Sequence, residues 1–250
     1  MAVAALLALS PAGGSLAAGL VPTGSSPAQG HAEVIAQGIA SLEKGKLVWQ
    51  VTSGEAPTKA KKSTHAGPGF LLTDSGQMIL VESNGNDAKK LAEGEATFIP
   101  KGKKQTRQSS RDQPADYFDI QIVKSSNGSN DDGASQSDSF RSLTGARDID
   151  LVRDVLNHND ETTIPKSDAP VLVFVTDGEI KIVESGHKDA QTLTKGQAAT
   201  FDSEIKVSSA DQGGTFVATV ELPHVQSSQT PSHAATNVDS GHRRTFGAYC

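Results

Sequence analysis

Sulfur and aromatic side chains are scarce in this chain of 250 residues. It has one cysteine, Cys250, which excludes an intrachain disulfide and a zinc site built from several cysteines. Aromatic residues make up 4% of the sequence, against 24 glycines and 11 prolines, and this balance favours many short elements joined by turns over long helices. The cores must therefore consist mainly of Val, Ile, Leu and Ala.

An excess of positive charge is also missing. The net charge is −6 at pH 7, which argues against a general nucleic-acid binder, because such proteins neutralise phosphates with cations. The charge is unevenly distributed: residues 31–124 hold 13 Lys and Arg against 11 Asp and Glu, a balance of +2, whereas residues 140–224 hold 8 against 14, a balance of −6. We expect two parts with different surfaces and no nucleic-acid partner.

No apolar run is long and uninterrupted enough to predict a membrane-spanning helix. The first twenty residues are rich in Ala and Leu, but Pro11, Gly13 and Gly14 interrupt them. Small residues at Ser26, Pro27 and Ala28 resemble a signal-peptidase site, although no Lys or Arg precedes Lys44. We interpret residues 1–28 as a signal peptide or disordered leader, and we expect a secreted or cell-envelope protein with no integral membrane segment after cleavage.

Short strands alternate with turns through the middle of the chain. Apolar residues at every second position predict strands from Leu47 to Val51 and over residues 116–123. Two apolar runs flank residues 73–76, as in a β-hairpin. Regularly spaced short strands indicate a sandwich or a barrel. Residues 147–160 fit either a helix face or a twisted strand, and the pattern does not decide between them.

Two segments lack the apolar residues that a core requires. Residues 125–139 contain no bulky apolar side chain, and we interpret them as a low-complexity linker. Residues 225–250 are too polar to pack, so we expect a disordered tail. These segments leave residues 31–124 and 140–224 as the two predicted domains.

The two predicted domains repeat one sequence pattern. The run TDSGQMILVES at 73–83 matches TDGEIKIVES at 176–185 with one residue deleted. Further matches follow at a constant offset of 102, such as Leu91 with Leu193. A unit of about a hundred residues is too long for a solenoid repeat, so we predict two copies of one β domain.

These residues resemble a bicupin, a protein of the cupin superfamily with two tandem jelly-roll barrels, or double-stranded β-helices. The glycine that closes the first motif of the family resembles Gly76 in one half and Gly178 in the other. The second motif of the family, a glycine followed by Pro-x-Gly, is matched by Gly94, Pro100 and Gly102. The resemblance implies an all-β fold of two tandem cupin-like barrels.

The resemblance also implies where a metal ion would lie, since catalytic cupins hold their ion with three histidines and a carboxylate. Counted from Gly76, the corresponding positions in the first half are Ser63, His65 and Gly69, with Gln105 in place of the last histidine. In the second half the same count gives Pro165, Ser167 and Val171. One histidine does not satisfy a divalent first-row metal. We therefore predict that both barrels are free of metal and of any other cofactor.

A histidine and a tyrosine of the first half could still support catalysis, because metal-free epimerases of this family use such a pair as base and acid. His65 would be the base and Tyr117 the acid. The simpler interpretation places His65 in a polar surface loop and Tyr117 on the outside of a strand. We favour the simpler interpretation.

A cluster of cations follows the second motif and could receive an anionic ligand such as an acidic sugar. A solvated hairpin whose lysines keep a sheet edge from pairing is the interpretation that we favour. The cluster consists of Lys101, Lys103, Lys104, Arg107 and Arg111.

The sequence thus predicts an exported, non-catalytic bicupin that acts as a ligand-binding, structural or interaction module. A small polar or anionic ligand would contact His65, Gln105, Lys103 and Arg107. A protein partner, including a second copy in a homodimer, is the other open possibility. The alternative is a cupin enzyme acting on a small polar or sugar-like substrate, either with His65 and Tyr117 as base and acid or with a degenerate metal site.

Overall fold

The computed structural model describes residues 31–82, 87–127, 134–141 and 145–223. The predicted leader at 1–28 and the predicted tail at 225–250 lie outside the described residues. Every regular element within those ranges is a β-strand, which confirms the predicted all-β class. The described part of the chain contains no helix that is long and apolar enough to cross a membrane.

The strands of the first half are short and separated by turns. They are β1 (Glu33–Ser41), β2 (Lys46–Ala56), β3 (Lys61–Thr64), β4 (Gly69–Thr73), β5 (Gln77–Glu82), β6 (Ala88–Ala92), β7 (Ala96–Ile99), β8 (Lys104–Ser109) and β9 (Ala115–Lys124).

The second half contains fewer and longer strands. They are β10 (Ala134–Gln136), β11 (Phe140–Arg141), β12 (Ala146–Leu156), β13 (Glu161–Ile164), β14 (Val171–Glu184), β15 (Ala190–Thr194), β16 (Ala198–Phe201) and β17 (Ile205–Pro223). The segment at 147–160, which fitted a helix or a strand, therefore lies mostly in β12.

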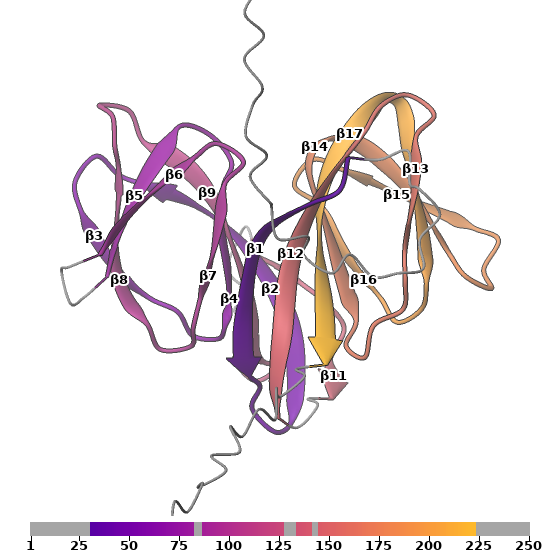
Figure 1. Ribbon diagram of the computed structural model, residues 1–250, viewed down its shortest axis with the longest axis horizontal. Coiled ribbons are helices and arrows are strands. Elements are labelled where there is room, and N and C mark those ends of the chain that lie inside the picture. Colours follow the sequence, from indigo (N-terminus) through magenta and orange to yellow (C-terminus); the bar gives the residue numbers. More distant parts are fainter. Residues whose placement is uncertain (1–30, 83–86, 128–133, 142–144, 224–250) are drawn as a thin grey trace, which may run out of the picture.

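Three sheets form two barrels, which stand side by side in Figure 1. One sheet has the order β10-β2-β9-β4-β7 and a second has the order β3-β8-β5-β6; they enclose the first barrel. The third sheet has the order β1-β12-β17-β14-β15, with β13 on β17 and β16 on β14, and curls into the second barrel. The two tandem jelly-roll barrels that the repeat predicts are confirmed.

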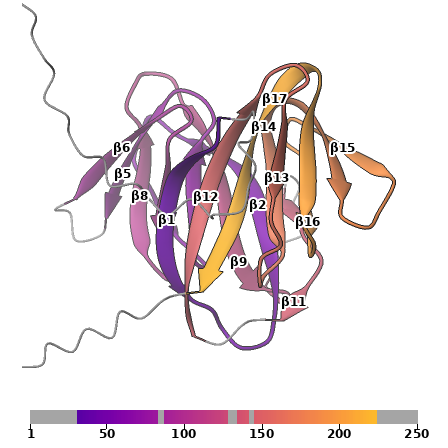
Figure 2. The same ribbon diagram turned by 45° about the vertical axis from the view of Figure 1, so that its right-hand side comes forward.

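Each barrel is extended by an edge strand that comes from the segment preceding the other barrel in the sequence. β1 pairs antiparallel with β12, from Glu33 opposite Arg153 to Ser41 opposite Ala146, and the two strands lie together in Figure 2. β10, which falls inside the predicted linker, pairs with β2. Hydrogen bonding thus crosses between the halves in both directions, and part of the predicted linker is a strand.

The predicted hairpin at residues 73–76 is a turn, but its flanking strands do not pair with each other. β4 pairs with β7 and β9, whereas β5 pairs with β6 and β8, so the turn carries the chain from one sheet of the barrel to the other. Gly76 occupies the left-handed region there, with φ of 74°. In the second half β14 runs through the matching corner as one strand with two register shifts, and this is where the sequence repeat lacks one residue.

The barrels are joined by a shared apolar core between their facing sheets. Phe118 of the first barrel meets Phe174 of the second edge to face, with ring centroids 4.5 Å apart. The indole of Trp49 is buried in the same core, and its Nε1 donates to the carbonyl of Pro170 at 3.0 Å. Each of the two facing sheets is therefore covered on both of its faces. The opposite barrel covers one face, and the interior of the sheet's own barrel covers the other.

Candidate functional site

The interior of the first barrel is part aliphatic and part ionic. Its aliphatic part contains Ala56, Leu71, Met78, Leu80, Leu91, Ile99 and Ala115. In the ionic part, every second side chain of β8 points inward, because successive residues of a strand face opposite sides. Gln105, Arg107 and Ser109 are buried in this way, and Asp119 reaches them from β9.

Asp119 is the centre of the ionic part. Nη2 of Arg107 donates to its Oδ2 at 2.8 Å, and the amide nitrogen of Gln121 donates to its Oδ1 at 2.8 Å. Nε2 of His65 lies 3.1 Å from the same Oδ1. Three side chains thus converge on one carboxylate.

His65 is buried at 1% exposure, so the surface-loop interpretation of this residue is wrong. Its backbone bridges the turn after β7: its N–H donates to the carbonyl of Lys103 at 3.3 Å, and its carbonyl accepts from Gly102 at 2.8 Å. Neither ring nitrogen has a hydrogen bond of good geometry within the described residues, despite the close approach to Asp119. Nε2 of His65 nevertheless lies close enough to the Asp119 carboxylate to interact with its charge.

The loop after His65 is tied to β9 by one amide side chain. Oε1 of Gln121 accepts from the N–H groups of Ala66 and Gly67, each at 3.0 Å. A Cβ at Gly67 would lie 1.8 Å from the carbonyl oxygen of Ile122, so only glycine permits this approach. Gln121 thus links the carboxylate of Asp119 to the loop that carries His65.

Arg107 fills the space between Asp119 and Tyr117. Its guanidinium carbon lies 4.9 Å from the centroid of the Tyr117 ring, a cation–π contact. With its amide oxygen turned towards Arg107, the orientation that its surroundings favour, Gln105 accepts from Nε at 3.1 Å and from Nη2 at 2.8 Å. Arg107 is 3% exposed and does not belong to the solvated turn in which the sequence pattern placed it.

The pKa of Asp119 lies below its ordinary value of 3.8. Burial alone would raise this pKa, but the contact with His65 and its charge, together with the charge and hydrogen bond of Arg107, outweigh burial. The carboxylate is therefore held in its ionised form by two side chains of the same lumen.

The cationic turn does not form one anion-binding patch. Lys101 pairs with Glu43, and Lys103 pairs with Glu82 at 2.6 Å, while Arg107 is inside the barrel. Of the four ligand-contacting candidates, His65, Gln105 and Arg107 come together in the lumen, and Lys103 lies apart in a surface ion pair.

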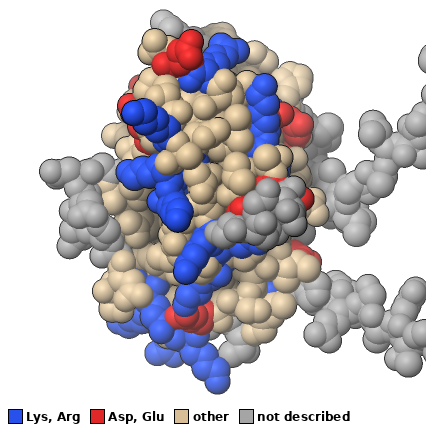
Figure 3. All heavy atoms as spheres, turned by 90° about the vertical axis from the view of Figure 1, so that its left-hand side faces the viewer, with Lys and Arg blue, Asp and Glu red and all other residues tan. Residues whose placement is uncertain are grey.

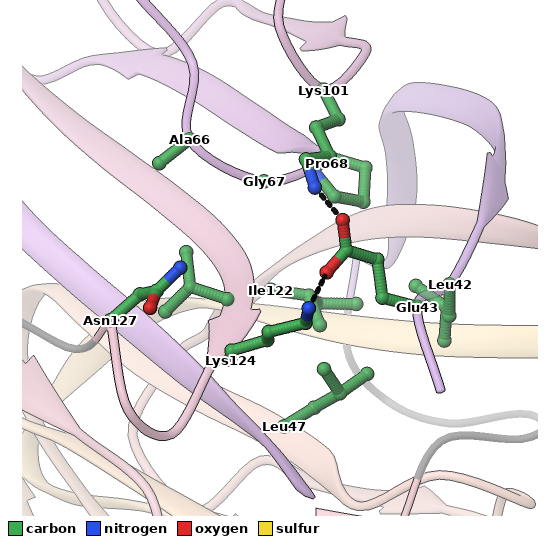
Figure 4. Close-up of a pocket in the computed structure, with 11 residues that line it drawn as sticks. Leu42, Glu43, Leu47, Ala66, Gly67, Pro68, Lys101, Ile122, Lys124 and Asn127 are labelled. Atoms are coloured by element: carbon green, nitrogen blue, oxygen red, sulfur yellow. Dashed lines mark ion pairs between the residues drawn. The ribbon is translucent and has the colours of Figure 1, made fainter. Parts of the chain in front are cut away.

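A small pocket with a volume of about 20 Å³ lies beside the loop after His65 (Figure 4). Glu43 bridges Lys101 and Lys124 among the residues that line it, the contact to Lys124 being 2.8 Å. The volume suits a single water molecule rather than a substrate.

The residues at the family's metal positions do not fit a divalent ion. Gly69 has no side chain, Gln105 is committed to Arg107, and His65 alone offers an imidazole. The guanidinium beside these positions would repel a cation. Within the residues that the structure describes, no three His, Cys, Asp or Glu side chains are grouped to hold a metal.

The interior of the second barrel is apolar at the matching strand positions. Leu80 faces Arg107 across β5 and β8, whereas Ile182 faces Val207 across β14 and β17. By the same pairing, the second-barrel counterparts of Gln105, Arg107, Tyr117 and Asp119 are Ile205, Val207, Phe216 and Ala218. All four are buried in its apolar core. Val171, at the family's carboxylate position, is buried in that core as well.

One acid is buried in the second barrel, and within the described residues no arginine pairs with it as Arg107 pairs with Asp119. Asp154 on β12 is 3% exposed, and its Oδ1 has no hydrogen-bond partner in the described part of the chain. Burial raises its pKa, against the opposing hydrogen bond of Thr162 and the weaker contributions of the Val155 backbone and of His31. The sequence pattern does not mark Asp154, because this residue belongs to no motif and lies in a strand that contains other acids.

No family model matches this chain, and no curated protein matches it in sequence. Solved structures share its fold. AerE from Microcystis aeruginosa is 15% identical, with a TM-score of 0.51, over 75% of this chain and 93% of AerE. Procruciferin, an 11S globulin from Brassica napus, is 7% identical, with a TM-score of 0.50, over 75% and 84%. The cupin 2 conserved barrel domain protein from Leptotrichia buccalis is 13% identical, with a TM-score of 0.43, over 74% and 89%.

Proposed function

Since this chain has the two-barrel cupin fold, we propose that it is an exported, non-catalytic module that acts through its architecture and surface rather than through a reaction inside a barrel. The observation that carries this proposal is the position of Arg107. Its guanidinium contacts Asp119 at 2.8 Å and Tyr117 at 4.9 Å, beside the position that the family resemblance assigns to a metal-binding histidine. The chain's own cation thus takes the place of an external ion.

The charge balance of the first lumen supports the same proposal. Arg107 and Asp119 neutralise each other, and Gln105 uses its amide oxygen on Arg107. A small polar or anionic ligand would have to displace Arg107 from both partners, which leaves the buried Asp119 carboxylate without its guanidinium partner. The apolar second lumen offers no polar side chain at the matching positions. A structural or protein-interaction role therefore has more support than a ligand-binding role.

Two measurements on the purified full chain test this proposal. Metal analysis should find no stoichiometric Mn, Fe, Ni or Zn, and a thermal-shift screen with acidic sugars and small carboxylates should give no concentration-dependent stabilisation. One bound ion per chain that is lost on His65→Ala would overturn the proposal. A ligand whose stabilising effect disappears in Arg107→Met would replace it with a ligand-binding role.

The alternative function, metal-free acid/base catalysis, has one observation in its favour. His65 and Tyr117 face the same lumen, and the ring nitrogens of His65 lack hydrogen bonds of good geometry in the described chain. Proton exchange into a panel of sugar nucleotides in D₂O, followed by NMR, tests it directly. Exchange that is lost in both His65→Gln and Tyr117→Phe would establish the enzyme, whereas a panel without exchange supports the non-catalytic module.

The proposed export has a separate test, because the leader lies outside the described residues. Expression in a secreting host should release a chain whose amino terminus is Gln29, the residue after the predicted cleavage site. Retention of residues 1–28 in an unprocessed chain inside the cell would contradict export.

A further inference from the structure

β1 presents an open edge at the end of the seven-stranded sheet. One side of β1 pairs with β12 through eight residue pairs, and no described strand pairs with its other side. An unpaired edge exposes a row of N–H and C=O groups that can accept another strand. In Figure 2, β1 and β12 run side by side, and β1 is the end strand of the order β1-β12-β17.

Two of the three large hydrophobic side chains that are exposed in the described residues lie on β1. They are Ile39, which is 56% exposed, and Val34, which is 49% exposed; the third, Val155, lies on β12 beyond the residues that pair with β1. Val34 and Ile39 point to the same side, because a register shift between Val34 and Ala36 restores the alternation. Together with Gln37 they form the exposed side of β1.

Other long or apolar edges of the molecule are protected. The edge strands of the β3-β8-β5-β6 sheet carry exposed lysine pairs, Lys61 and Lys62 on one side and Lys89 and Lys90 on the other. On that side of the molecule, Lys and Arg are more prominent than Asp and Glu in Figure 3. The edge strands β7 and β10 are only four and three residues long. β1 has nine residues and contains no lysine, arginine or proline, so it lacks the usual protection of an edge.

The composition of β1 suits pairing with an identical strand. Its single charged residue, Glu33, is bonded to Arg153 at 2.8 Å within the same chain. With the register shift after Val34, antiparallel pairing centred on Gln37 brings Glu33 opposite Ala40 of the second copy, so no like charges meet. The same pairing brings Ile39 across from Val34 of the second copy. The exposed apolar side chains then cover one another.

The opposite side of β1 is already fixed. Ala40 is buried in the core between the barrels, and a Cβ at Gly38 would lie 2.1 Å from the ring of Phe98. The strand is therefore held in an extended form before any partner arrives, which lowers the entropy cost of pairing.

We propose that the free edge of β1 pairs antiparallel with β1 of a second copy, so that the seven-stranded sheets of two chains join about a two-fold axis. The occupant is a second copy because the edge is self-complementary in charge and in the placement of its exposed apolar side chains. This inference stands apart from the proposed function, since it concerns a surface that neither lumen includes.

Sedimentation velocity on the full chain measures the association directly. We expect a dimer of the 26.0 kDa chain. Introducing lysines as Gln37→Lys with Ile39→Lys should weaken dimerisation by about 100-fold, because like charges then meet across the axis. Val155→Lys is the matched control, an exposed apolar residue on β12 outside the pairing, and should remain dimeric. A monomeric wild type, or a double-lysine variant that dimerises as well as the wild type, would overturn the proposal.

Cross-linking tests the register. In a Cys250→Ser background, Gln37→Cys places two thiols opposite each other at the axis, within the Cα separation that a disulfide requires. Mild oxidation should yield a covalent dimer, and Thr192→Cys on the distant strand β15 should not. A dimer that Gln37→Cys does not cross-link would use another surface and would refute the β1 interface.

Discussion

Where the first barrel buries Arg107 against Asp119, the second buries Val207 and Ala218 at the matching positions of equivalent strand pairs. The surrounding strands keep the same pairing, and the sequence repeat covers both. The second barrel therefore closes around an apolar core, with no counterpart of the Arg107–Asp119 ion pair at the matching positions. The ions of the first barrel are a feature added to the fold rather than a requirement of it.

The comparison also shows what a buried charge demands of its neighbours. Asp119 has Arg107, Gln121 and His65 around it, and its pKa is lowered. In the second barrel, the side chain of Thr162 donates a hydrogen bond to Asp154, but burial outweighs it and raises the pKa of Asp154. Similar burial thus leads to opposite shifts, and the difference lies in the partners. Four experiments follow from this contrast.

The largest effect is expected for Arg107→Met. This variant leaves Asp119 buried without its guanidinium partner and should lower the free energy of unfolding by about 3–5 kcal/mol. Val207→Ala at the matching position of the second barrel removes only apolar contacts and should cost about 2 kcal/mol. Urea unfolding, followed through Trp49, the single tryptophan, measures both variants. An Arg107→Met cost no larger than that of Val207→Ala would mean that the ion pair is not effectively buried.

A double variant should recover much of that loss by making the first lumen resemble the second. Arg107→Met combined with Asp119→Leu removes both charges and puts apolar side chains in their place. We expect a stability within about 1 kcal/mol of the wild type, because two apolar residues can replace a buried ion pair. The double-mutant cycle, with Asp119→Leu alone as its fourth corner, gives the coupling energy. A double variant less stable than Arg107→Met would show that the rest of the network depends on both ions.

The sequence predicted the parts of this fold that local chemistry determines. The repeat revealed two barrels, and Gly76 and Gly178 both take positive φ at the matching corner, as the family's glycine positions suggested. The pairing of β1 with β12 was not predictable in the same way, because an alternating apolar pattern indicates a strand but does not identify its partner.

The ionic lumen was missed for a related reason. On β9, Tyr117, Asp119 and Gln121 alternate with apolar residues, which is the pattern of a strand with one solvated face. In the structure both faces of β9 are covered, the apolar one by the second barrel and the polar one by the first lumen. One sequence signal points to this lumen: Arg107 and Asp119 lie on two strands of one barrel, at positions whose side chains can face the interior. Only the tertiary pairing shows that they meet.

The two buried acids should give opposite dependences of stability on pH. The folded pKa of Asp119 lies below 3.8, so its ionised form stabilises the fold above that pH, and the contribution is lost as the pH falls through the folded pKa. The folded pKa of Asp154 lies above 3.8, so its contribution is present below that pH and is lost as the pH rises through the folded pKa.

Urea unfolding of Asp119→Asn and Asp154→Asn as a function of pH separates these contributions. Asp119→Asn should be less stable than the wild type at neutral pH, by about 1–3 kcal/mol, and should approach the wild type in acid. Asp154→Asn should equal or exceed the wild type at neutral pH, with the advantage shrinking below 3.8. Parallel pH profiles for the two variants would contradict the contrast between the barrels.

The smallest effects are expected at exposed ion pairs, which both barrels have. Lys103 pairs with Glu82 at 2.6 Å on the first barrel, and Lys206 pairs with Glu161 at 3.1 Å on the second. Because water screens these partly exposed charges, Lys103→Met and Lys206→Met should each change the free energy of unfolding by less than about 0.5 kcal/mol, and by less still in high salt. If Lys103→Met cost as much as Arg107→Met, the first barrel would be sensitive to its net positive charge, and burial would not be what distinguishes the two lumens.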